Sequence, residues 1–148
     1  MNAMLSRAAL ALSLCAVLTG CARHELPTAT IQVGELSMKV ELAAEPSQRN
    51  KGLMLRDSLP ANEGMLFLYP DEAPREFWMK NTRIPLSIAY IDRTGKIVRI
   101  ADMKPLDTHT TKSLYPAMYA LEVNRGWFEA HGVDVGTMIT RIPDVDAS

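Results

Sequence analysis

The chain has 148 residues, of which 47% are hydrophobic, 22% charged and 6% aromatic, with 16 Lys and Arg against 17 Asp and Glu. This composition is typical of a globular protein and excludes a disordered polymer, a collagen-like repeat and a disulfide-dense miniprotein. The formal net charge of −1 also argues against nucleic acid as a partner, because a surface for nucleic acid needs a basic excess.

The amino terminus has the pattern of a secretory signal. Arg7 precedes an apolar run over residues 8–17, which suits a signal-peptide core and is too short to span a bilayer. The run ends at Leu18-Thr19-Gly20-Cys21, which resembles the lipobox of bacterial lipoproteins. The resemblance implies that residues 1–20 are a lipoprotein signal peptide and that Cys21 carries the lipid. The alternative is an ordinary cleaved signal with an incidental cysteine.

Acyl chains on Cys21 would hold the protein at a membrane, with residues 21–29 as a lipidated tether. Ala22 follows the cysteine in place of the aspartate that resembles an inner-membrane retention signal, so we expect an outer-membrane lipoprotein that faces the periplasm. The two cysteines, Cys15 and Cys21, both belong to this amino-terminal segment. The rest of the chain therefore offers no thiol for a disulfide, a metal or nucleophilic catalysis.

Residues 30–43 predict a β-hairpin. Apolar and polar residues alternate from Leu36 to Ala43, and Gly34-Glu35 suits a type II′ two-residue turn. A second hairpin is predicted from residues 86–91 and 96–103, with Gly95 able to adopt positive φ in the connection. Further short strands are predicted at residues 65–69, 77–80, 118–124 and 137–142.

Two segments favour helices. Residues 45–56 begin with Pro46, which is common at the first helical position, and residues 125–131 are followed by Gly132 as a cap. The chain therefore predicts one domain over residues 30–143, followed by a carboxy-terminal tail over 144–148. We expect a mainly β fold, a single antiparallel sandwich or barrel-like domain with one or two short helices.

Four segments have distinctive sequences: QRNKGLMLR at 48–56, GMLF at 64–67, FWMKNTRIPL at 77–86 and LEVNRGW at 121–127. In this order they resemble the domain of unknown function 192 family over residues 30–142. The resemblance implies a small β-rich domain, often secreted or membrane-anchored, and brings no established activity. The family usually continues Ile-Pro-Leu with an aspartate, whereas Ser87 stands here.

The first segment predicts a candidate anion site. In a continuous helix, Arg49 and Arg56 would lie on nearly the same face with Gly52 between them, and the two guanidinium groups could bind a carboxylate or phosphate. The alternative, which we favour, is that both arginines pair with acidic side chains and that Gly52 relieves crowding against a strand.

Trp78 and Lys80 would share one face of their strand, opposite Phe77 and Met79. They could form the wall of a groove for a sugar or peptide. The alternative is a core tryptophan with the lysine stem running past it.

Glu122 lies in a predicted strand, on a face with apolar neighbours, and a buried acid needs a partner. It is either a general acid or base with a raised pKa, or the partner of Arg49 or Arg56 in an ion pair that fixes the helix on the sheet.

The rest of the sequence has few residues that suit catalysis or metal binding. His109 lies with Asp107 in a polar loop, where ligands often bind. The three histidines are scattered and lack the spacing of zinc ligands, and the methionines lie in apolar runs that suit core packing, so we expect neither a metal nor a cofactor.

Three hypotheses follow. The first is a non-catalytic envelope domain that binds a small anionic or saccharide ligand or another envelope protein. Its surface would comprise Arg49, Arg56, Trp78, Lys80, Glu122 and His109. The second is a hydrolase or lyase that acts on envelope material through Glu122 with Asp107 or His109. The third is a purely structural lipoprotein. An open cleft between residues 46–56 and the strand carrying Trp78 would favour a ligand-binding role.

Overall fold

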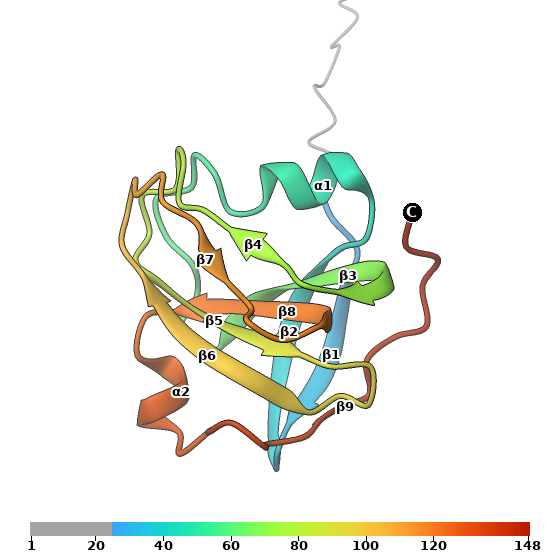
Figure 1. Cartoon of the computed structure of the whole chain (residues 1–148). Coiled ribbons are helices and arrows are strands. Elements are labelled where there is room, and N and C mark those ends of the chain that lie inside the picture. Colours follow the sequence, from blue (N-terminus) through green and yellow to red (C-terminus); the bar gives the residue numbers. More distant parts are fainter. Residues whose placement is uncertain (1–24) are drawn as a thin grey trace, which may run out of the picture.

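The computed structural model describes residues 25–148 and consists mainly of β-strands, as predicted (Figure 1). The signal-peptide segment and Cys21 lie outside the described residues. A curled seven-stranded sheet has the order β6-β5-β8-β3-β2-β1-β9. Its strands are β1 (Thr28–Val33), β2 (Leu36–Ala43), β3 (Glu63–Ala73), β5 (Leu86–Ile91), β6 (Ile97–Met103), β8 (Ala117–Asn124) and β9 (Ile139–Thr140). The other elements are the pair β4 (Glu76–Phe77) and β7 (Thr111–Lys112) and the helices α1 (Pro46–Lys51) and α2 (Trp127–Ala130).

Both predicted hairpins are confirmed. In the β1–β2 hairpin Val33 pairs with Leu36, which leaves Gly34 and Glu35 as the turn. Gly34 has φ +60°, as the first central position of a type II′ turn requires. The β5–β6 hairpin turns through residues 92–96.

One strand pair departs from the antiparallel expectation. β2 and β3 are parallel, with Lys39 opposite Glu63 and Ala43 opposite Phe67. Parallel neighbours need a crossover connection, and residues 44–62, which include α1, provide it. The alternation of apolar residues indicates which face of a strand is buried, but it does not indicate the direction of the neighbouring strand.

The sheet separates two hydrophobic clusters. Along β8, Leu121 and Val123 belong to the cluster that contains α2, whereas Ala120 packs in the cluster under α1 and β4. Because side chains alternate along a strand, Glu122 lies on the same face as Ala120. Its carboxyl is thereby directed towards the second cluster.

Three predicted elements are shorter in the structure. The helix predicted over 45–56 ends at Lys51, because Gly52 has φ 47° and ψ −135°, a conformation outside the helical region. The strands predicted at 77–80 and 137–142 extend only over Glu76–Phe77 and Ile139–Thr140. The second helix, α2, forms within the predicted residues 125–131.

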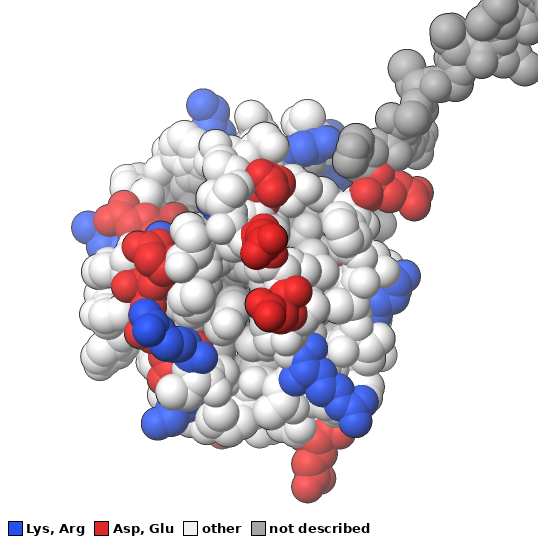
Figure 2. All heavy atoms as spheres, turned by 90° about the vertical axis from the view of Figure 1, so that its right-hand side faces the viewer, with Lys and Arg blue, Asp and Glu red and all other residues white. Residues whose placement is uncertain are grey.

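The face shown in Figure 2 carries basic and acidic side chains in a mixed arrangement, with acidic groups along its centre. No large basic field covers this face, which agrees with the near balance of charges in the sequence. Among residues 25–148, no helix is both long and apolar enough to cross a bilayer.

Candidate functional site

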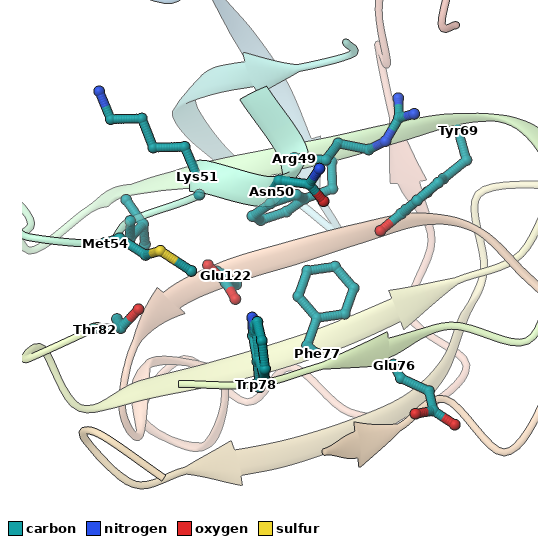
Figure 3. A pocket seen from close by; sticks show the side chains of 13 residues that line it. Arg49, Asn50, Lys51, Met54, Tyr69, Glu76, Phe77, Trp78, Thr82 and Glu122 are labelled. Carbon is teal, nitrogen blue, oxygen red and sulfur yellow. The ribbon is translucent and has the colours of Figure 1, made fainter. Parts of the chain in front are cut away.

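A cavity of about 160 Å³ opens between α1 and β4. Its walls come from residues 49–54, residues 76–78, and Phe67, Tyr69, Thr82 and Glu122 (Figure 3). This is a cleft at the place that the sequence interpretation specified, between the 46–56 segment and Trp78. The volume is close to that of a cavity that accepts a single benzene ring.

Glu122 lies at the base of the cavity. In the sheet it stands opposite Met65 of β3 and Ile88 of β5, and its side chain is only 4% exposed. It is the one charged residue among those buried in the described part of the chain. Its carboxyl points into the space between Met54 and Trp78 (Figure 3). Burial raises the pKa of this carboxyl to about 8, because removal from water disfavours the charged form.

The ion pair predicted between Glu122 and Arg49 or Arg56 is wrong. Arg49 donates hydrogen bonds to the carbonyl oxygens of Ala44 and Leu68, the latter at 2.9 Å. Arg56 lies beyond the end of α1 and binds both carboxylate oxygens of Glu41, at 2.5 and 2.7 Å. Within residues 25–148 the Glu122 carboxyl thus has neither a hydrogen bond nor an ion pair.

The two arginines also do not form the anion site that a continuous helix would create. Because α1 ends at Lys51, Arg49 and Arg56 do not share a helical face. The favoured alternative is confirmed for Arg56, which pairs with an acidic side chain, and is wrong for Arg49, which binds backbone carbonyls. The crowding expected at Gly52 is not found, because a Cβ there would lie at an ordinary contact distance of 3.4 Å from the ring of Phe67 on β3; the φ of +47° is what favours glycine at this position.

Trp78 belongs to the wall of the cavity and not to the core. It is 46% exposed, whereas Phe77 and Met79 on either side are buried, so the predicted alternation of faces is confirmed. Lys80 Nζ lies 5.1 Å from the centroid of the Trp78 ring. The interpretation of Trp78 as a core residue is therefore wrong.

His109 is not brought to the cavity. Its side chain is 94% exposed, with Nδ1 2.8 Å from Oδ1 of Asp107, and neither residue lines the cavity. The pair of Glu122 with Asp107 or His109, on which the hydrolase hypothesis depends, is not formed. The other acid in the wall, Glu76, has its carboxyl turned away from Glu122 (Figure 3) and pairs with Lys112 at 3.5 Å.

Sequence reasoning missed the aromatic residues Phe67, Tyr69 and Phe77 and the hydroxyl of Thr82 as parts of this site. A signal for most of them was present. The four distinctive segments contribute, in order, residues 49–54, Phe67, Phe77 with Trp78 and Thr82, and Glu122. Segments far apart in sequence thus meet at one cavity, and that convergence identifies the site more directly than any single charged residue.

The domain of unknown function 192 family, described as an uncharacterised ACR, matches residues 29–141. The chain belongs to this family. The sequence resemblance is therefore confirmed, and none of the curated proteins matches the chain.

Two crystal structures resemble this family member. One is described as a proposed transcription regulator from Sinorhizobium meliloti 1021, with TM-score 0.77, 32% identity, and coverage of 78% of this chain and 95% of that chain. The other is a protein of unknown function from Novosphingobium aromaticivorans DSM 12444, with TM-score 0.74, 30% identity, and coverage of 78% and 86%.

Ser87, where the family usually has an aspartate, lies outside the cavity. It pairs with Val123 of β8, the residue after Glu122, and alternate residues face opposite sides of the sheet. The departure from the family pattern at this position therefore leaves the Glu122 site intact.

Proposed function

We propose that the chain is an outer-membrane lipoprotein, anchored through Cys21 and facing the periplasm, whose domain binds a small ligand without converting it. The observation that carries the binding role is the carboxyl of Glu122, buried and unpartnered at the base of an open, aromatic-walled cavity. An acid with little access to water and no protein partner destabilises the fold, and its carboxyl oxygens keep their solvent contact through the cavity, so a purely structural role gives no reason to retain it.

The walls favour a ligand of the size of one ring, such as a single saccharide unit. The cavity of about 160 Å³ admits one ring, and Trp78 presents its indole beside Glu122. An anionic ligand is less well supported, because the buried charge-bearing group is itself an acid and Arg49 and Arg56 bind other groups.

Binding is favoured over hydrolysis because acid–base hydrolysis usually needs two groups placed across the substrate. Glu122 has no second carboxyl or imidazole directed at it within the described chain. The S. meliloti protein is described as a proposed transcription regulator, but the charge balance of this chain, 16 basic and 17 acidic residues, does not favour nucleic acid as its ligand.

Ligand binding is tested by titrating the domain with glucose, glucosamine and N-acetylglucosamine in a calorimeter. We expect at least one sugar to bind wild type, with at least tenfold weaker binding to Glu122→Leu, in which the carboxyl is lost. The matched control is Glu129→Gln, an exposed acid on α2. Absence of binding by all three sugars, or equal binding to Glu122→Leu, would contradict a saccharide site.

The anchor is supported by the lipobox resemblance and by the tether. Residues 22–27 can extend over at most about 20 Å, so a lipid on Cys21 would hold the first strand close to the membrane surface. We expect radioactive palmitate to label the wild-type protein in growing cells and not the Cys21→Ser variant. An unlabelled wild-type protein would exclude the anchor.

A further inference from the structure

We propose that the ligand of this cavity carries a protonated amino group, and that the ionised carboxyl of Glu122 is its counter-ion between the aromatic walls. The inference rests on the proposed ligand-binding function and narrows the chemical class of the ligand. It comes from the composition of the cavity, which offers a buried acid and several aromatic rings but directs no cation at that acid.

The first observation is that no positively charged side chain of the described residues pairs with Glu122. Two cationic residues line the cavity, Arg49 and Lys51, and both side chains extend away from Glu122 (Figure 3). Arg49 lies over the ring of Tyr69, 4.9 Å from its centroid, and binds backbone carbonyls. A positive group that enters the cavity would therefore meet an acid that no described side chain neutralises.

The second step is the aromatic wall. Phe67 and Phe77 pack edge to face with their centroids 4.9 Å apart, and Trp78 stands beside them. The negative faces of aromatic rings attract cations, and the attraction is strongest for tryptophan and where water is excluded. A carboxylate among such rings is better suited to an ammonium group than to a neutral hydroxyl.

The third step is the proton balance. Because burial raises the pKa of Glu122 to about 8, the free protein carries this group as a carboxylic acid at pH 6. Binding of R–NH₃⁺ then breaks the carboxyl O–H bond and releases one proton to solvent, leaving the ammonium–carboxylate pair. Affinity for a cation should therefore rise about tenfold from pH 6 to pH 7, about fivefold from pH 7 to pH 8, and level off above pH 8. A neutral ligand that accepts a hydrogen bond from the acid should instead keep constant affinity below pH 8 and lose it above.

We expect the pH dependence of ligand affinity to come from Glu122 and not from the other titratable groups around it. Tyr69 on β3 and Tyr90 on β5 both have raised pKa values, because burial disfavours the phenolate, so both stay neutral from pH 6 to 8. Arg49 and Lys51 on α1 are cationic, and Glu76 on β4 is paired with Lys112.

The experiment uses cyclohexylamine and cyclohexanol, two six-membered rings that differ in the amino group. Calorimetric titrations of wild type at pH 6, 7 and 8 should show cyclohexylamine binding about 50-fold more tightly at pH 8 than at pH 6, because the ionised fraction of Glu122 rises from about one hundredth to one half. Two buffers of different ionisation enthalpy should report release of one proton at pH 6. Glu122→Gln should remove both effects, and Glu129→Gln should retain both.

A second variant guards against misfolding of the Glu122 variant. Trp78→Ala keeps the carboxyl, so it should weaken cyclohexylamine binding while the pH dependence persists. Tighter binding of cyclohexanol than of cyclohexylamine, or an affinity for the amine that does not change with pH, would overturn the ammonium assignment and leave ligand binding intact. Failure of both rings and of all three sugars would overturn the assignment together with the proposed function.

Discussion

The hydroxyl of Ser87 donates a hydrogen bond to Oδ1 of Asp102 at 2.6 Å, across the β5–β6 pair in which the two residues are directly opposite. The same hydroxyl oxygen accepts a hydrogen bond at 2.9 Å from the backbone N–H of Gly126, which caps α2. Arg125 Nε lies 3.2 Å from the second oxygen of Asp102. The family usually has a carboxylate at position 87. In this chain Ser87 occupies that position, and the carboxylate beside it belongs to Asp102 on the adjacent strand β6.

This arrangement predicts coupling between Ser87 and Asp102. Ser87→Asp would place two carboxylates directly opposite each other in the sheet, so we expect a loss of about 1–2 kcal/mol in the free energy of unfolding. The double variant Ser87→Asp/Asp102→Ser restores one carboxylate and one hydroxyl, and should recover most of this loss. Urea denaturation of the four proteins in a double-mutant cycle measures the coupling, and purely additive effects would exclude it.

Stability should decrease with pH because of Glu122. Its pKa is raised from 4.5 to about 8 on folding, so between these values the folded protein holds a proton that the unfolded chain releases. The stability associated with this group is complete below pH 4.5 and is lost as pH rises towards 8, at about 1.4 kcal/mol per pH unit.

Urea denaturation of wild type and Glu122→Gln between pH 5 and 8 isolates the contribution of Glu122. We expect the difference between the two proteins to shift in favour of the glutamine variant as pH rises. A difference that stays constant over this range would show that the carboxyl does not change its protonation on folding.

Truncation of the two tryptophans should lower the free energy of unfolding by very different amounts. Trp78 is half-exposed, so Trp78→Ala should change the free energy of unfolding by less than about 1 kcal/mol while it weakens ligand binding. Trp127 is 6% exposed and packs against Phe128, so Trp127→Ala should cost about 3–5 kcal/mol. Chemical denaturation measures the stability changes, and calorimetric titration measures ligand binding. A large stability loss from Trp78→Ala would show that Trp78 has a structural role.

Gly64 should not tolerate a side chain. A Cβ at this position would lie 2.6 Å from the backbone carbonyl oxygen of Glu122, and neither strand can move without breaking the β3–β8 ladder. We expect Gly64→Ala to lower the free energy of unfolding by several kcal/mol. At Gly132, where a Cβ meets nothing within 4 Å, only the positive φ opposes alanine, and the cost should be about 1 kcal/mol. Equal costs in thermal melts would contradict the steric explanation.

Local pattern determined much of this protein. The alternation of apolar residues and the Gly34-Glu35 turn predicted the first hairpin, and the same alternation placed Glu122 on an apolar face of its strand. The four distinctive segments predicted the family. These features depend on neighbours within a few residues, because strand periodicity and turn conformation are local properties of the backbone.

Only the tertiary structure decided the partners of the charged groups and the direction of β3. Gly52 ends α1, so Arg56 reaches Glu41, while Arg49 reaches carbonyl oxygens of Ala44 and Leu68. Glu122 is left without a counter-ion, and Trp78 remains exposed at the cavity. The physical reason is that a long charged side chain binds whichever group the fold brings within its reach. The groups that Arg49 binds include the carbonyl oxygens of Leu68, 19 residues away, and Ser148, 99 residues away, and strand periodicity encodes neither contact.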